Sequence, residues 1–273
     1  MFEAVYMAAT GLTNQQRRMD VIADNVANVN TAGFKASRLD FKDAIYTSAT
    51  GTVVTPPAVE GMGIYPPGPA YTPGGNLQKG HGVMTAAITH NYAPSSISET
   101  GSMLDFAIEG DAFFEVVDNN GNVYYTRAGN FYISNEPDGL VLVDSRGHYV
   151  MDDAGGKIIF PNETTSVEVS IEGLITFKNE DTELGTVQFG LYTFSNKTGL
   201  NASGNSTYSV TVASGEAVPA GEYRIRQYML ENSNVDMATE MTRLIRTQRA
   251  LQLASRALRT ADDMEGIANN IRR

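Results

Sequence analysis

The chain has 273 residues, a length that suits two modest domains or one domain with extensions. It contains no cysteine, which excludes disulfides, zinc–thiolate sites and thiol nucleophiles. The chain has 20 basic and 31 acidic side chains. Residues 1–45 and 233–273 together hold 12 of the basic and 10 of the acidic ones, so the middle holds eight basic and 21 acidic side chains. Such an acidic middle would repel nucleic acid and anionic lipid, so we expect no nucleic-acid binding.

Neither a cleaved signal nor a membrane span is expected. The first residues lack a basic region, and their longest apolar run, Ala4–Ala9, is too short for a signal peptide. No segment approaches the roughly 18 apolar residues that a membrane span needs, so we expect no membrane insertion. Composition alone leaves a cytoplasmic location and export without a cleaved signal equally open.

Residues 3–29 predict one long helix with the heptad spacing of a coiled coil. The first heptad position is taken by Val5, Leu12, Met19 and Val26, and the second by Ala8, Gln15, Ile22 and Val29. A cluster of Asn, Thr and Gly at residues 28–33 ends the helix. Because Ala8 and Gln15 bury little apolar surface, this helix alone in water should be marginal and should need other helices.

Between the helices, the sequence predicts an extended linker followed by a β-rich domain. Residues 46–100 include a Gly/Pro-rich stretch, Tyr65–Leu77, in which proline disfavours regular elements. The alternative is an arm that becomes ordered only against neighbouring subunits. Residues 104–228 contain many short strand-like runs, which favour a sandwich or a barrel, and Asp118–Gly121 predicts a hairpin with a type I′ turn.

A second long helix is predicted over residues 233–272, where Ser233 and Asp236 resemble a capping box. Its apolar stripe has a period near 3.5 residues. The stripe comprises Met237, Met241, Leu244, Gln248, Leu251, Ala254, Leu258, Ala261, Met264, Ala268 and Ile271. We interpret Arg243, Arg246 and Arg249 as a solvated flank that pairs with acidic neighbours in an assembly, rather than as a nucleic-acid site.

These elements predict an α+β fold in which long N- and C-terminal helices form a coiled-coil-like inner domain with an inserted β-rich outer domain. Residues 1–45 are expected to be the N-terminal helix and turn of the inner domain, and 46–100 the Gly/Pro-rich extended linker. Residues 101–228 are the expected outer domain, and 229–273 the C-terminal helix of the inner domain.

The sequence offers no candidate catalytic, cofactor or metal site. His81, His90 and His148 lack metal-ligand spacing, and no nucleophile elbow is present. Residues 118–122 lack the glycine and glutamate positions of a calcium loop. We therefore expect a structural assembly subunit with no cofactor, and not an enzyme. An extracellular enzyme and a nucleic-acid-binding coiled coil are the rival classes.

The end of the first predicted helix carries the most specific motif. The run Met19–Lys35 resembles the N-terminal signature of bacterial flagellar rod and hook proteins almost residue for residue. The runs Leu104–Gly110 and Tyr125–Gly129 are similar to the core of that family's outer domain. The run that starts at Ser233-Asn234-Val235-Asp236 is similar to the family's C-terminal motif. Three motifs in the right order make the resemblance specific.

The resemblance implies a structural subunit of the flagellar basal body, exported through the flagellar type III apparatus without a cleaved signal. It implies a helical homopolymer that transmits torque. Other rod and hook proteins and the export apparatus are the further partners, with the bushing-ring proteins as an additional candidate. The length and single outer domain favour a distal rod subunit, with a proximal rod subunit or a short hook protein as alternatives. The expected assembly interface is Val5, Leu12, Met19, Ile22, Val26, Asn25, Asn28, Asn30, Met241, Leu244, Leu251 and Leu258.

Overall fold

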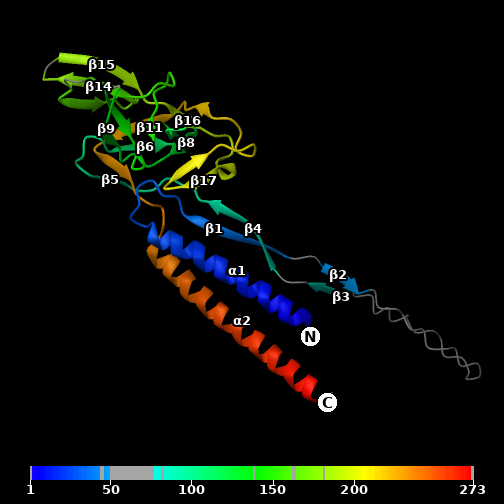
Figure 1. Ribbon diagram of the computed structural model, residues 1–273. Coiled ribbons are helices and arrows are strands. Elements are labelled where there is room, and N and C mark those ends of the chain that lie inside the picture. The colour runs from blue at the N-terminus through cyan, green and yellow to red at the C-terminus, as the bar shows by residue number, and fades with distance from the viewer. Residues whose placement is uncertain are drawn as a thin grey trace, which may run out of the picture. The chain divides into compact units, whose positions relative to one another are not determined.

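The computed structural model describes residues 2–43, 46–49, 77–80, 83–137, 139–161, 164–180 and 182–271. Figure 1 shows two long helices, α1 (Phe2–Ala27) and α2 (Met237–Ile271), and a β-rich body drawn in green to yellow. The chain divides into two compact units. One unit comprises Met1–Arg18, Leu39–Ala87 and Arg246–Arg273, and the other comprises Met19–Arg38 and Ile88–Ile245.

The β-rich body is built around a ten-stranded antiparallel sheet. Seven strands follow the order β12-β10-β11-β7-β8-β18-β17, while β9 pairs with β10, β16 with β7, and β19 with β16. The strands are β7 (Phe113–Val117), β8 (Val123–Thr126), β9 (Tyr132–Glu136), β10 (Gly139–Val143), β11 (Tyr149–Val150), β12 (Ile159–Phe160), β16 (Leu191–Thr193), β17 (Asn201–Gly204), β18 (Thr207–Ser209) and β19 (Val218–Pro219). A short 3₁₀ helix, Lys197–Gly199, precedes β17.

Smaller sheets complete the described strands. One three-stranded sheet contains β13 (Ser166–Val169), β14 (Leu174–Asn179) and β15 (Thr182–Gln188). The two-stranded pairs are β6 (Phe106–Gly110) with β20 (Tyr223–Gln227), β5 (Ile97–Glu99) with β21 (Met229–Glu231), β1 (Ser37–Asp43) with β4 (Val83–His90), and β2 (Tyr46–Ala49) with β3 (Leu77–Gly80).

Phenylalanine side chains dominate the core of the β-rich body. The rings of Phe114 and Phe131 lie 5.1 Å apart and those of Phe106 and Phe189 lie 5.2 Å apart, both edge to face. Phe113, the neighbour of Phe114 in β7, belongs instead to a second buried cluster. Successive side chains of a strand point to opposite faces, so β7 supplies both clusters.

The predicted β-rich middle and its hairpin are confirmed, but the hairpin turn differs from the expected type I′. The Asp118 backbone NH donates to the Asn122 carbonyl (3.0 Å), and the Gly121 NH donates to the Asp118 carbonyl (3.0 Å). Gly121 has a φ of 85° and Asn120 has no positive φ. A type I′ turn needs positive φ at both central residues, so this is a three-residue loop that ends in a left-handed glycine.

The prediction of a coiled-coil-like inner domain is wrong. Both predicted helices form, but the structure shows two single helices and a β-rich body rather than a paired coiled coil. A coiled coil buries the apolar residues of its seam. Here Met264, a predicted seam residue, is 61% exposed, and Tyr6 and Leu253 are 62% and 64% exposed. The buried residues of the two helices are mostly polar, and include Asn14, Asn25, Glu240 and Thr247.

Polar side chains of α1 bind strands, which explains the failure of the coiled-coil prediction. Asn14 Nδ2 donates to the Val83 carbonyl (2.5 Å), and its Oδ1 accepts from Thr85 Oγ1 (2.9 Å). The Asn25 amide also binds a strand, through both the backbone NH and the carbonyl of Ser37. A heptad pattern records that one helix face is apolar, but it does not identify what that face meets.

Most of the predicted Gly/Pro-rich stretch, including residues 65–76, lies outside the described residues. The flanks of the expected linker form β2, β3, β4 and β5. Neither α1 nor α2 has, over its described residues, an apolar stretch long enough to cross a membrane.

Candidate functional site

Three charged side chains that are far apart in the sequence form a buried ion triad. Lys35 Nζ lies 2.7 Å from Glu231 Oε1, and Arg127 Nε lies 2.7 Å from Glu231 Oε2. The side chains of Lys35, Arg127 and Glu231 are 0%, 4% and 2% exposed. One carboxylate is therefore shared between two cations in a region that water does not reach.

Backbone carbonyls accept further hydrogen bonds from the two cations. Lys35 Nζ also donates to the carbonyl of Ala93 (2.9 Å). The Arg127 guanidinium donates to three carbonyls of β6 and the turn that follows it, namely those of Ile108 (3.0 Å), Gly110 (2.8 Å) and Ala112 (2.9 Å). Buried charges are stable only when they are both paired and hydrogen-bonded, and here both conditions hold.

The triad shifts the pKa of its own members. Burial raises the pKa of the Glu231 carboxyl, but Arg127 and Lys35 together outweigh burial and hold that pKa below its ordinary value. Burial lowers the pKa of Lys35, and Arg127 adds to that decrease despite the opposing effect of Glu231. The carboxylate faces two cations, which outweigh its burial, whereas the effect of the shared carboxylate on Lys35 does not outweigh the burial of that side chain.

Asn25, in the motif that ends the first helix, connects α1 to β1. Its Oδ1 accepts from the Ser37 backbone NH (2.8 Å), and its Nδ2 donates to the Ser37 carbonyl (2.8 Å). The amide thus pairs with both backbone groups of the first residue of β1, as a neighbouring strand would.

Replacing this amide is expected to weaken the connection between α1 and β1. Asn25→Ala leaves both backbone groups of Ser37 without a partner in a buried position, at a cost of about 2 kcal/mol. Hydrogen exchange at the Ser37 amide should speed up, as measured by mass spectrometry. Asn30→Ala is the matched control, since Asn30 is exposed. Equal exchange in the two variants would contradict this role for Asn25.

Two glycines allow backbone segments to meet beside the triad. Gly33 has a φ of 66°, its NH donates to the Glu231 carbonyl (2.8 Å), and a Cβ there would lie 2.5 Å from the Ala128 nitrogen. A Cβ on Gly129 would lie 1.8 Å from the Phe106 carbonyl oxygen. Only glycine fits either position without moving backbone.

Asn234, just before α2, binds the same region. Its Oδ1 accepts from the Ala36 NH (2.7 Å), and its Nδ2 donates to the Asn91 carbonyl (2.7 Å). The approach to α2 is therefore tied to the segment that follows α1. We call the following residues the junction cluster: Asn25, Gly33, Lys35, Arg127, Gly129, Glu231 and Asn234.

The apolar residues predicted for the assembly interface differ in exposure. Ile22 is buried within the chain, and Met241 is exposed. The others are half-buried, namely Val5, Leu12, Met19, Val26, Leu244, Leu251 and Leu258. The single chain therefore leaves part of this surface uncovered.

The predicted asparagines also fall in different places. Asn25 is buried in the junction cluster. Asn28 Nδ2 donates to the Asp24 carbonyl (2.9 Å) and its Oδ1 accepts from Thr31 Oγ1 (3.1 Å), so it closes the end of α1. Asn30 is exposed and lines an open pocket of about 430 Å³.

Sequence reasoning missed the roles of Arg127 and Glu231. Arg127 lies in the run Tyr125–Gly129, which supported the family resemblance without a role for its charge. Glu231 lies in none of the quoted motifs and is 104 residues from Arg127. No local spacing marks a pair so distant, so only a three-dimensional arrangement could show it.

Within the part of the chain that the structure describes, no group of three or more His, Asp or Glu side chains could hold a metal ion. His81 is outside those residues. His90 Nδ1 lies 3.1 Å from Ser37 Oγ, and His148 Nδ1 lies 3.1 Å from Asp144 Oδ2. Both imidazoles are thus engaged in contacts within the fold.

Three protein-family profiles match the chain. Residues 5–35 match "Flagella basal body rod protein", residues 107–177 match "Flagellar hook protein FlgE/F/G D1 domain", and residues 226–271 match "Flagellar basal body rod FlgEFG protein C-terminal". Lys35, Arg127 and Glu231 lie one in each matched segment. The ion triad therefore joins all three.

Relatives of known name match over the whole length. The chain is 38% identical to the flagellar basal-body rod protein FlgG of Borreliella burgdorferi over 284 residues, covering 100% of both chains. It is 32% identical to FlgG of Bacillus subtilis, also over 100% of both chains. It is 34% identical to FlgG of Agrobacterium fabrum over 97% of this chain and 98% of the relative.

The fold and these matches define a structural component of the bacterial flagellum, a class that does not consist of enzymes. The chain belongs to the flagellar basal-body rod protein family, and within it resembles the proteins named FlgG. It is a structural subunit of the rod, its place is the flagellar basal body, and it assembles with other rod and hook components.

Proposed function

We propose that the chain polymerises with copies of itself into the distal part of the rod. Successive copies contact one another head to tail, and such contacts build a helical filament when the rotation does not close a ring. Full-length similarity to proteins named FlgG supports this assignment over a proximal rod subunit or a short hook protein. Many contacts along the helices would resist shear, so the rod would transmit torque.

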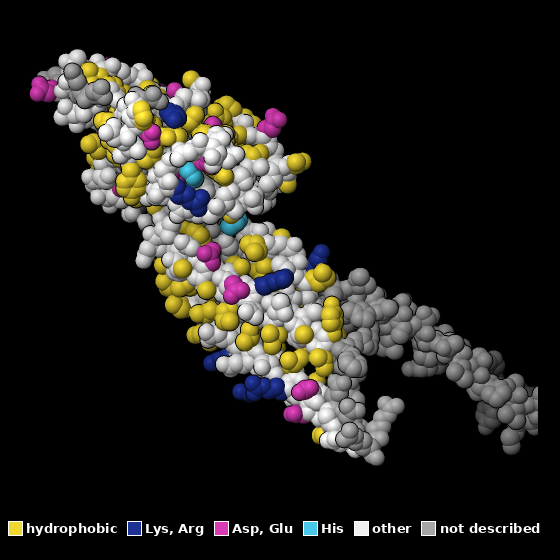
Figure 2. Space-filling model, viewed as in Figure 1, with side chains coloured by type: hydrophobic (Ala, Val, Ile, Leu, Met, Phe, Trp, Pro, Cys, Tyr) yellow, Lys and Arg dark blue, Asp and Glu magenta, His cyan; other side chains and the backbone are white. Residues whose placement is uncertain are grey.

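Exposed apolar side chains along the helices carry this proposal. Ile245, Leu253, Met264 and Ile267 on α2 are 51–64% exposed, as is Tyr6 on α1 at 62%. Figure 2 shows hydrophobic side chains along the surface of the helical part of the molecule. Burial of this apolar surface against other copies would stabilise the assembly by about 25 cal/mol per Å². The single chain leaves the surface exposed and lacks this stabilisation.

We propose that the assembly surface includes half-buried and exposed residues of both helices and of the turn that follows α1, in keeping with the sequence prediction. It comprises Val5, Leu12, Met19, Val26, Asn28, Asn30, Met241, Leu244, Leu251 and Leu258. Ile22 and Asn25, which are buried in the chain itself, would hold the end of α1 in place behind that surface. Residues 101–228 would form the outer domain, residues 1–45 and 229–273 the inner assembly segments, and residues 46–100 the link between them.

The remaining partners are part of the same proposal. We infer that the flagellar type III apparatus exports the chain without cleaving a signal. The bushing-ring proteins around the rod are a further candidate partner. The family resemblance supports both inferences.

Electron microscopy of basal bodies tests the proposed position. Deletion of the gene is expected to leave an axial structure that stops within the rod, and the wild-type gene should restore it. A gene carrying Leu253→Asp and Met264→Asp should not restore it, because buried unpaired carboxylates would oppose assembly. Val212→Asp is the matched control, since Val212 is fully exposed in the β-rich body. A complete rod in the deletion strain would refute the proposal.

A further inference from the structure

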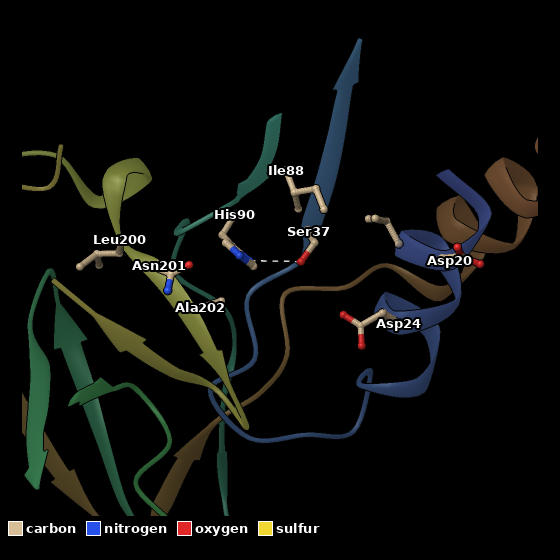
Figure 3. Close-up of a pocket in the computed structure, with 9 residues that line it drawn as sticks. Asp20, Asp24, Ser37, Ile88, His90, Leu200, Asn201 and Ala202 are labelled. Carbon is tan, nitrogen blue, oxygen red and sulfur yellow. Dashed lines mark hydrogen bonds between the residues drawn. The ribbon is translucent and has the colours of Figure 1, made fainter. Parts of the chain in front are cut away.

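An open groove of about 480 Å³ lies between the C-terminal part of α1 and the outer strand of the β-rich body. Figure 3 shows Asp20 and Asp24 on the helix side, and Asn201 and Ala202 of β17 on the opposite side. β17 is the last strand in the sheet order, so no described strand covers its outer edge. The groove is thus bounded by a helix and by a strand edge.

The groove has an acidic wall and an apolar floor. Asp20 and Asp24 are exposed and four residues apart, so both carboxylates lie on one face of α1. The floor is the apolar part of the lining, which includes Ile88 and Val21, and Ile88 is 55% exposed. Burial lowers the pKa of His90, the remaining titratable lining residue, so its imidazole is uncharged at neutral pH and does not neutralise the carboxylates.

The groove continues into a smaller pocket of about 140 Å³ that shares Asp24, Ser37 and His90 with it. Ser206 lines this pocket and is 8% exposed. Its hydroxyl oxygen has no hydrogen-bond partner within the described residues. A buried hydroxyl is normally paired, so the site lacks a polar group that a ligand could provide.

The chain carries a surface of matching chemistry on α2. At about 3.6 residues per turn, Arg246, Arg249 and Arg256 share one face with Leu253. All four residues are exposed. On the opposite face of α2 lie three half-buried leucines, Leu244, Leu251 and Leu258. The arginine face is therefore turned away from the contacts that α2 makes within the chain.

We propose that the arginine face of α2 from a second copy of the chain docks in this groove. The guanidinium groups would pair with Asp20 and Asp24, and a guanidinium N–H would donate to Ser206 Oγ. Leu253 would cover the floor around Ile88. The proposal rests on polymerisation, and it names one contact that joins successive copies.

Charge distribution favours this occupant. Residues 233–273 carry seven arginines against five acidic residues, whereas residues 46–232 hold 21 acidic side chains against eight basic ones. The richest source of cationic side chains in the chain is thus α2 and its end. Complementary charge of this kind also fixes the orientation in which two copies meet.

Engineered cysteines test the contact, because the natural chain has none. One copy carries Ala202→Cys and a second copy, with a tag of different size, carries Leu253→Cys. After mixing and oxidation, the two copies should form a disulfide-linked heterodimer. The controls are Ala254→Cys, which is half-buried and off the arginine face, and Val212→Cys, which is exposed outside the groove. A heterodimer yield no higher than in these controls overturns the proposal.

Charge variants test the proposed pairing. Asp20→Asn with Asp24→Asn should lower the heterodimer yield about fivefold, as expected for loss of exposed ion pairs. The exchange Asp20→Arg, Asp24→Arg, Arg249→Asp and Arg256→Asp in both copies should restore it. An unchanged yield in the Asn variant overturns the proposal. If the cysteine variants polymerise but give no crosslink above the controls, this contact alone is refuted. If the wild-type chain never polymerises, the proposed function is refuted.

Discussion

Glu231→Gln is expected to destabilise the folded chain by about 3–5 kcal/mol, because it leaves two buried cations without a carboxylate. The amide keeps the shape of the side chain, so the loss of stability measures the effect of removing the negative charge. Urea unfolding of the full chain, followed by circular dichroism, measures it. The control is Glu168→Gln: Glu168 is 64% exposed and pairs with Lys178 at 2.6 Å, and such a surface pair contributes less than about 1 kcal/mol. Similar losses in the two variants would contradict a stabilising role for the triad.

The same carboxylate makes stability depend on pH. Its pKa is lower in the folded chain than the ordinary value of 4.5. Its contribution is therefore complete above that value and is lost as the pH falls through the folded pKa. Between pH 7 and pH 3 the wild type should lose more thermal stability than Glu231→Gln. Parallel pH profiles for the two chains would contradict the lowered pKa.

Gly129→Ala is expected to cost about 4 kcal/mol or more, which places it among the most damaging single substitutions. The added Cβ would lie 1.8 Å from the Phe106 carbonyl oxygen, so backbone at the start of β6 would have to move. That movement would also disturb the bond from the Phe106 NH to the Gly129 carbonyl (3.0 Å). The shift in the urea midpoint measures the cost.

Gly185→Ala is the matched control for this prediction. Gly185 also lies in the β-rich body, a Cβ added there would meet no described atom within 4 Å, and its φ is not positive. Alanine there should change the free energy of unfolding by less than about 1 kcal/mol. If both substitutions had the same effect, the close approach of Gly129 to Phe106 would not explain the loss of stability in Gly129→Ala.

Periodicity and turn residues predicted the separate elements of this fold well. The two helices and strands such as β7 and β8 form where apolar spacing places them, because those signals are local. The pairing of the helices was predicted wrongly, since the spacing showed an apolar face but not its partner. Two asparagines outside the predicted seam positions were informative. Asn14 and Asn25 bind the backbone of β4 and β1, so one face of α1 meets strands rather than a helix.

The junction cluster was only partly visible in the sequence. The run Met19–Lys35 indicated a special site and placed Asn25 in it, but assigned its amide to a neighbouring copy. The structure gives Asn25 a partner within the chain, and it adds Arg127 and Glu231, whose roles depend on contacts across the whole chain. Buried ion pairs between distant segments leave no periodic trace, so spacing rules do not find them.

The Lys35–Glu231 pair also sets an order of events in folding. The two residues are separated by 196 positions, so Lys35 leaves the ribosome long before its carboxylate exists. Contacts of such large sequence separation form late. A partly synthesised chain would carry two cations, on Lys35 and Arg127, without their common counter-ion. The ion triad would therefore be unable to form until nearly all of the polypeptide had been made, and the segments that it joins would pack together only in the finished chain.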